Sequence, residues 1–182
     1  MTPVAYRRRI LIDPDPALRK VAKKVSALEL RMPLTQQLID DMIETMREAP
    51  GIGLAAPQVG VGKRIFVADV GEDEEGERTL YVFVNPVLTD FAGEETATEG
   101  CLSIPGKIGE VTRAATCTIS GWDRRGKKAR VDASGILARC IQHEVDHLDG
   151  ILITDKATNM REAVPVGAGD VKDVEAAKEV NI

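Results

Sequence analysis

The stretch His143-Glu144-Val145-Asp146-His147 decides both the fold and the chemistry that we expect, and it holds the only two histidines of the chain. Residues four apart on a helix share one face, so both imidazoles can bind a single metal ion. The glutamate of the stretch then lies beside that ion, where it can accept a proton from water. The HExxH pattern therefore predicts a metal centre carried on a helix.

The residues around this pair follow a helical pattern between positions 132 and 150. Asp132 or Ser134 can cap the start of the helix, and Gly150 can end it. Ile136 and Cys140 fall on the same stripe as the two histidines. We expect this stripe to face the interior, where a buried histidine pair needs a partner such as a metal ion.

The rest of the chain alternates irregularly between strand and helix patterns. Residues 35–48 carry an apolar stripe at helical spacing, which Thr35 can cap and Pro50 can end. Four strands are expected, at residues 64–70, 79–88, 110–122 and 127–132. Because strands and helices do not alternate strictly, the sequence predicts an α+β fold. In it, antiparallel sheets pack around a central helix that carries the HExxH motif.

Length and charge indicate one domain with a polar tail. The 182 residues fit a single domain, which we place at residues 1–164, followed by a tail at 165–182 that can form a short helix. A net charge of −5 gives no general attraction to nucleic acid or anionic lipid. The sequence shows neither an apolar stretch of membrane-spanning length nor a signal-peptide pattern. We therefore expect a cytoplasmic protein without DNA or membrane partners.

The third ligand of the expected metal centre has several candidates. A further histidine is excluded at the metzincin position, which holds Ile153. Glu162 or Glu175 would complete a zinc endopeptidase site, but both lie in or beside the polar tail. Cys101 is the better candidate, because Gly100 lets the backbone approach closely. A structural metal site in a non-catalytic binding protein would need a fourth protein ligand.

Two further segments join HEVDH in a shared pattern. Residues 51–58 read GIGLAAPQ, and residues 99–103 read EGCLS. The three segments resemble the signature motifs of the peptide deformylases, in the family's order. The resemblance extends from about residue 13 to about residue 156, and EGCLSIP is similar to the type 1 form of bacteria and organelles. It implies a hydrolase that removes the N-formyl group from the N-terminal formylmethionine of nascent proteins and releases formate.

The resemblance also implies roles for individual residues. The metal ligands would be Cys101, His143 and His147. The ion in this family is commonly Fe²⁺, with Zn²⁺, Ni²⁺ or Co²⁺ as substitutes, and one divalent ion is expected per chain. Glu144 would transfer protons. The Gln58 amide and the Leu102 backbone N–H would stabilise negative charge on the formyl oxygen.

Substrate contacts and supporting residues complete the expected site. Gly53 would offer backbone hydrogen bonds to the peptide. An apolar methionine pocket would be lined by Ile52, Ile136, Cys140 and His143. Glu99 and Arg113 would pair behind the ligands and hold them in place. The tail is net acidic rather than basic, so we expect any contact with the ribosome to be transient, without a basic docking helix.

Overall fold

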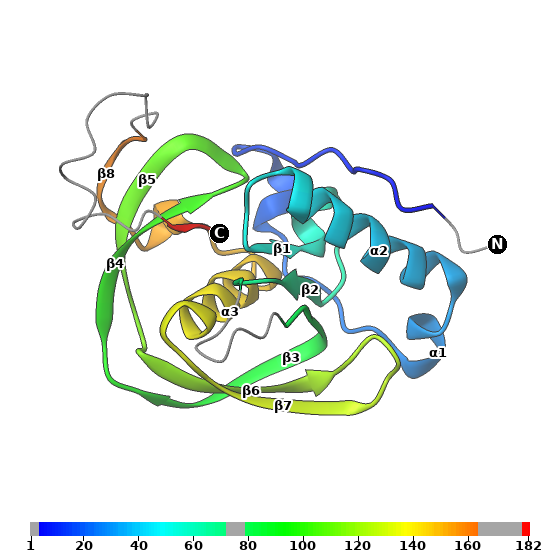
Figure 1. Cartoon of the computed structure of the whole chain (residues 1–182). Coiled ribbons are helices and arrows are strands. Elements are labelled where there is room, and N and C mark those ends of the chain that lie inside the picture. Colours follow the sequence, from blue (N-terminus) through cyan, green and yellow to red (C-terminus); the bar gives the residue numbers. More distant parts are fainter. Residues whose placement is uncertain (1–3, 72–78, 164–179) are drawn as a thin grey trace.

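The computed structural model describes residues 4–71, 79–163 and 180–182. The described strands form two sheets that enclose helix α3 (Gly135–Leu148), as Figure 1 shows. This arrangement confirms the predicted α+β class and places the HExxH helix between the sheets. Among the described residues, no helix is long and apolar enough to cross a membrane.

The larger sheet has five strands in the order β1-β2-β3-β6-β7, and every neighbouring pair is antiparallel. Its strands are β1 (Gly53–Ala55), β2 (Ile65–Ala68), β3 (Tyr81–Ala92), β6 (Thr116–Trp122) and β7 (Lys128–Ser134). A tight turn joins β6 to β7. It closes because the Asp123 carboxylate accepts the N–H groups of Arg125 and Lys127.

The smaller sheet has the strand order β8-β5-β4-β9. Its strands are β4 (Glu95–Cys101), β5 (Ile104–Arg113), β8 (Thr158–Glu162) and β9 (Val180–Asn181). Strands β4, β5 and β8 are antiparallel, whereas β9 pairs with β4 in parallel. A tight turn at Leu102 and Ser103 joins β4 to β5, since Cys101 pairs directly with Ile104.

The prediction of a single strand at residues 110–122 is wrong, because the chain crosses from one sheet to the other within this range. Strand β5 ends at Arg113 in the smaller sheet, and β6 begins at Thr116 in the larger one. At the crossing, the Ala114 N–H donates to the Gln142 side chain of α3, and the Ala114 carbonyl accepts from the same amide. Because a helix side chain satisfies these backbone groups, the strand can end at this half-buried position.

The helix predicted at residues 35–48 is present as α2 (Pro33–Glu48), which begins earlier than expected. Its N-cap is Met32 rather than Thr35, since a proline is favoured at the first helical position. Its apolar stripe is buried as predicted and consists of Leu38, Ile39, Met42, Ile43 and Met46. The short helices are α1 (Ala27–Leu30), η1 (Pro16–Arg19), η2 (Ala56–Val59) and η3 (Ile153–Asp155).

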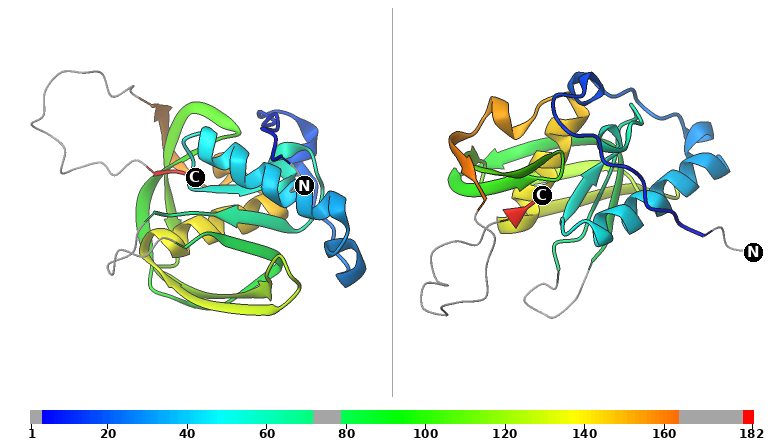
Figure 2. Two further views of the ribbon diagram at one scale, coloured as in Figure 1. Left: turned by 45° about the vertical axis from the view of Figure 1, so that its right-hand side comes forward. Right: turned by 90° about the horizontal axis from the view of Figure 1, so that it is seen from above.

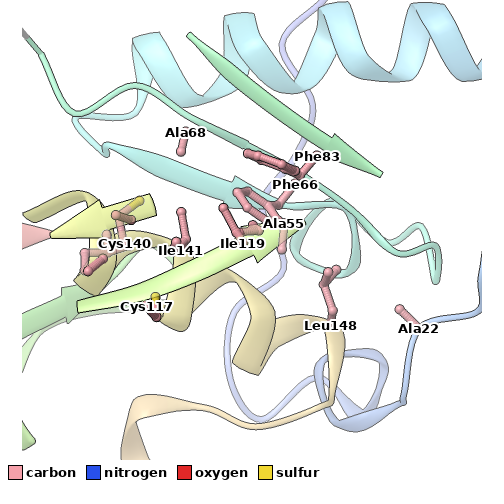
Figure 3. Close-up of a cluster of buried hydrophobic side chains, with 13 residues drawn as sticks. Ala22, Ala55, Phe66, Ala68, Phe83, Cys117, Ile119, Cys140, Ile141 and Leu148 are labelled. Carbon is pink, nitrogen blue, oxygen red and sulfur yellow. The ribbon is translucent and has the colours of Figure 1, made fainter. Parts of the chain in front are cut away.

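The main core lies between α3 and the larger sheet, as Figure 3 shows. Phe66 and Phe83 stack on neighbouring strands with ring centroids 5.7 Å apart. Ile141 and Leu148 of α3 pack in the same buried cluster, together with Cys117 of β6. Cys117 is 2% exposed and is therefore a core residue. This packing holds one face of α3 rigidly against the sheet.

The end of α3 generates the first prediction. Gly150 has a φ of +74°, and an added Cβ would lie 2.5 Å from the Arg19 carbonyl oxygen. Gly150→Ala should therefore lower the free energy of unfolding by about 2 kcal/mol or more, through backbone strain and this overlap. Urea or thermal unfolding measures the change. Gly62→Ala is the control, because no atom lies within 4 Å of that added Cβ; equal losses in both variants would contradict this reading.

Candidate metal centre

Three potential ligand atoms converge at the centre of the molecule. The Cys101 thiol and the imidazoles of His143 and His147 are all buried, and their ligand atoms lie within 4.8 Å of one another. His147 Nε2 is 3.3 Å from Cys101 Sγ and 3.2 Å from His143 Nε2. Tetrahedral coordination at ordinary metal–ligand bond lengths separates ligand atoms by roughly 3.3–3.6 Å. The donor set therefore fits a single divalent ion.

Two elements from different layers bring these atoms together. The histidines lie one turn apart on α3, and Cys101 is the last residue of β4. The turn that follows Cys101 is held from outside, since the Asp13 N–H donates to the Ser103 carbonyl. The thiol is thus fixed against the helix by the backbone rather than by a flexible loop.

Burial keeps all three ligands uncharged when no cation balances them. It raises the pKa of the Cys101 thiol to about 12, and the nearby carboxylates of Glu144 and Glu99 act in the same direction. Burial also lowers the pKa of His143, and lowers that of His147 well below its ordinary value. A cation at this centre must therefore displace a proton from the thiol, whereas the imidazole nitrogens are already free to bind.

The Glu144 carboxyl is buried beside the ligands without a partner. Among the described residues, neither of its oxygens has a hydrogen bond. Burial raises its pKa well above the ordinary value. Its Oε1 lies so close to Gly53 that a Cβ on that residue would overlap it. An unpaired buried carboxyl is costly for folding, and such groups are typical of acid–base catalysis.

The Gln58 side chain is oriented by the backbone of the preceding strand. It is fully buried, and its Oε1 accepts the Ala55 N–H at 2.8 Å. Its Nε2 consequently faces Ser103 Oγ at 3.3 Å and Cys101 Sγ at 3.9 Å. The amide donor is therefore directed at the ligand side of the site.

The ion pair that the sequence predicts between Glu99 and Arg113 is present. Arg113 binds both carboxylate oxygens, at 2.6 and 2.9 Å. Burial alone would raise the pKa of Glu99, but its hydrogen bonds with His143 and Arg113 hold it far below the ordinary value. The anionic Glu99 lies 3.0 Å from His143 Nδ1. This contact favours a proton on Nδ1 and leaves Nε2 free for a metal.

Arg139 is a supporting residue that the sequence interpretation missed. It is buried, and its guanidinium donates to Glu99 Oε1 at 2.6 Å and to the carbonyls of Val111 and Glu95. A signal was available, because Arg139 precedes His143 by one helical turn on the stripe expected to face inward. On the other side of Glu99, Arg113 also binds Asp146 at 2.8 Å.

The expected pocket residues are only partly brought together. Cys140 is fully buried and lies 3.6 Å from the Ile52 carbonyl oxygen. Gly53 begins β1, which is an edge strand of the larger sheet. Ile136 is 38% exposed, so the expectation that the whole helical stripe faces inward is wrong at its first turn. Residues 134–136 are all exposed, so α3 enters the interior only after its first turn.

Of the alternative third ligands, Glu162 does not join the centre. Glu162 lies exposed on β8, where it is opposite Lys107 in the backbone register with β5. Glu175 falls outside the described residues. Within the described ranges, the group of Cys101, His143 and His147 includes no fourth protein ligand, which disfavours a closed structural site.

Comparisons with known proteins find similar sequences and similar folds. Residues 7–163 match the family described as polypeptide deformylase. The peptide deformylase of Pelotomaculum thermopropionicum is 52% identical over 151 residues, which cover 83% of this chain and 92% of that protein. The crystal structure of a Legionella pneumophila peptide deformylase has a TM-score of 0.75 at 42% identity, covering 84% of this chain and 87% of that one. A class I type b enzyme from Acinetobacter baumannii, solved with Met-Ala-Ser bound, has a TM-score of 0.79 at 33% identity, covering 84% and 99%.

The charge network predicts that Arg139 supports metal binding without touching the ligands. Arg139→Met removes one donor from the Glu99 carboxylate, which positions His143. We expect the affinity for Zn²⁺ to fall about 10- to 100-fold, as for other partners behind metal ligands. Competition with a chelator measures this affinity. Arg130→Met is the control, because that side chain is 65% exposed; similar affinities in both variants would contradict a positioning role.

The raised pKa of Cys101 predicts a proton-linked metal affinity. Below about pH 12 the thiol is protonated, so each bound ion must release at least that proton. Affinity should therefore rise about tenfold per pH unit between pH 6 and 8, and fall as the pH is lowered. Chelator competition at three pH values tests this, with Glu144→Ala as the variant that removes the neighbouring carboxyl, whose pKa is also raised. An affinity independent of pH would show that the thiol is already ionised.

Proposed function

The chain belongs to the polypeptide deformylase family and removes the N-formyl group from nascent peptides; we propose that it does so with a metal ion held by Cys101, His143 and His147. The observation that supports this most directly is the convergence of three buried ligand atoms beside an unpartnered buried carboxyl. Such a centre offers three protein ligands and one open position, as catalytic metal sites do. When bound, the metal supplies Lewis acidity that polarises the formyl carbonyl and makes water acidic near neutral pH.

Glu144 is the proposed acid–base group. Its carboxylate accepts the proton of the attacking water and then donates it to the amine that leaves when the formamide C–N bond breaks. Burial, which raises its pKa, suits both steps, because a raised pKa makes the carboxylate a stronger base near neutral pH. The absence of competing hydrogen bonds from the described residues leaves both of its oxygens available to water and substrate.

Gln58 and the Leu102 N–H are the proposed donors to the formyl oxygen. The Gln58 amide is held with its Nε2 toward Cys101, and Leu102 follows Cys101 in the turn between β4 and β5. Preorganised donors of this kind stabilise the charge that develops on the oxygen during attack. Loss of one typically costs about 3 kcal/mol of transition-state stabilisation.

The peptide substrate is proposed to bind between two strand edges. One is β1, whose backbone at Gly53 approaches Glu144 closely because it has no side chain. The other is the edge of β4 that leads into Cys101. The methionine side chain would enter the apolar space at Ile52 and Cys140, with Ile136 and the His143 ring at its border. The Met-Ala-Ser tripeptide in the Acinetobacter baumannii enzyme supports recognition of a short peptide with an N-terminal methionine.

The identity of the ion and the setting of the reaction are also proposals. We propose Fe²⁺ as the ion used in the cell, with Zn²⁺, Ni²⁺ and Co²⁺ as substitutes, since thiolate and imidazole ligands accept all four. Three buried free cysteines are consistent with a reducing, cytoplasmic setting. Nascent chains bring the enzyme near the ribosome, and we propose that this contact is transient.

The experiment is formate release from formyl-Met-Ala-Ser, with protein purified and assayed without oxygen and supplied with Fe²⁺ or Ni²⁺. Formate release that is lost in Cys101→Ala supports the proposed ligand set. The same reactions are examined for cleavage of internal peptide bonds. Internal cleavage without formate would overturn the assignment in favour of an endopeptidase.

Glu144→Ala separates the chemical role from the structural one. We expect this variant to keep its metal and to lose about 10²–10⁴-fold in kcat, the usual contribution of acid–base catalysis. Its thermal stability should be equal or higher, because it removes a buried carboxyl without a hydrogen-bond partner. Metal content, Tm and formate release are measured on one preparation. A variant that retained kcat would exclude Glu144 as the proton carrier.

A further inference from the structure

The segment Val180–Ile182 lies on the free edge of β4, beside the metal centre. Its strand β9 pairs in parallel register with Glu99 and Gly100. The Ile182 N–H donates to the Gly100 carbonyl at 3.4 Å, and the Leu102 N–H donates to the Ile182 carbonyl oxygen at 3.2 Å. In Figure 1 this segment is the red end beside β4, and Figure 2 shows the same end from two further directions.

The Ile182 side chain is packed as firmly as a core residue. It is 0% exposed and belongs to the buried cluster that contains Cys140, against which Ile52 also packs. Ile52 and Cys140 are two of the proposed walls of the methionine pocket. The segment therefore occupies a backbone donor proposed for the formyl oxygen, and its side chain packs in the same buried cluster as the proposed pocket walls.

Building on the proposed function, we propose that Val180–Ile182 is an intramolecular ligand of the peptide-binding groove, which a formylated nascent peptide must displace. The segment lies outside residues 7–163, the part of the chain that matches the family. The residues proposed to occupy the groove therefore lie beyond the region that the family match covers.

The direction of the segment explains why it can occupy the groove without being hydrolysed. It runs parallel to β4, so its carbonyl end points toward Cys101 and Leu102. A substrate must bring its formylated amino end to the same place, and so must run in the opposite direction. The segment consequently presents no formyl group to Glu144.

Tethering makes even a weak contact of this kind effective. A ligand on the same chain has an effective concentration in the millimolar range, so three docked residues can hold the groove for much of the time. Occupation and substrate binding exclude each other, whereas the displaced state is fully active. The segment should therefore raise KM and leave kcat unchanged.

The experiment compares the kinetics of the wild-type chain with those of two variants at Ile182. Ile182→Asp places a charge among the buried apolar side chains, and Ile182→Gly removes the anchor without adding charge. If the segment fills the groove about nine tenths of the time, KM for formyl-Met-Ala-Ser falls about tenfold at constant kcat. Val21→Asp is the control, because that side chain is 68% exposed on the surface. A synthetic peptide of residues 176–182, Ala-Ala-Lys-Glu-Val-Asn-Ile, should inhibit both Ile182 variants competitively.

Amide hydrogen exchange at Leu102 tests docking independently of activity. The exchange should be faster in both Ile182 variants than in wild type and Val21→Asp, because the hydrogen bond to Ile182 is lost. Unchanged exchange, or an unchanged or higher KM in an active enzyme, would overturn the intramolecular ligand and leave the deformylase function intact. Faster exchange in a protein that releases no formate would support the docked segment and count against the proposed mechanism.

Discussion

The buried carboxylate of Glu99 is the interaction on which the rest of the site depends. It belongs to β4, and it is bound by Arg113 of β5 and by Arg139 and His143 of α3. An ionised group in the interior is tolerable only when its hydrogen-bonding capacity is met, so this network constrains the smaller sheet and the central helix to one relative position. That position brings Cys101 of β4 to the histidines of α3.

The site combines this fully satisfied carboxylate with an unsatisfied one. Glu99 has hydrogen-bonding or ionic contacts with three side chains, whereas Glu144 has no hydrogen bond from the described residues. The first arrangement gives rigidity, and the second leaves a carboxyl reactive at the expense of stability. Gly53 leaves room for the unpaired Glu144 carboxyl, because any side chain at position 53 would occupy the volume of that carboxyl. Glu99 thus positions the ligands because it is fully hydrogen-bonded, and Glu144 is available to react because it is not.

The same geometry brings two strand edges to the metal centre, that of β1 and that of β4, on which β9 lies. A strand edge with free backbone groups binds extended peptide of almost any sequence, which suits an enzyme that processes many nascent chains. It also accepts the chain's own Val180–Ile182 segment. Breadth of recognition and self-occupation therefore have one physical origin, which is backbone pairing at an exposed edge.

The sequence alone determined the features that depend on local spacing. The placement of His143 and His147 on one helical face follows from a periodicity within five residues, and the three motifs carried the resemblance that pointed to Cys101, Gln58 and Glu144. Tertiary structure decided the strand break at Ala114, the burial of Arg139 against Glu99, the exposure of Ile136 and the docking of Ile182 on β4. Each of these results depends on contacts between residues distant in the sequence. Local propensity contains no information about which backbone group, carboxylate or strand edge such a residue will meet in the folded chain.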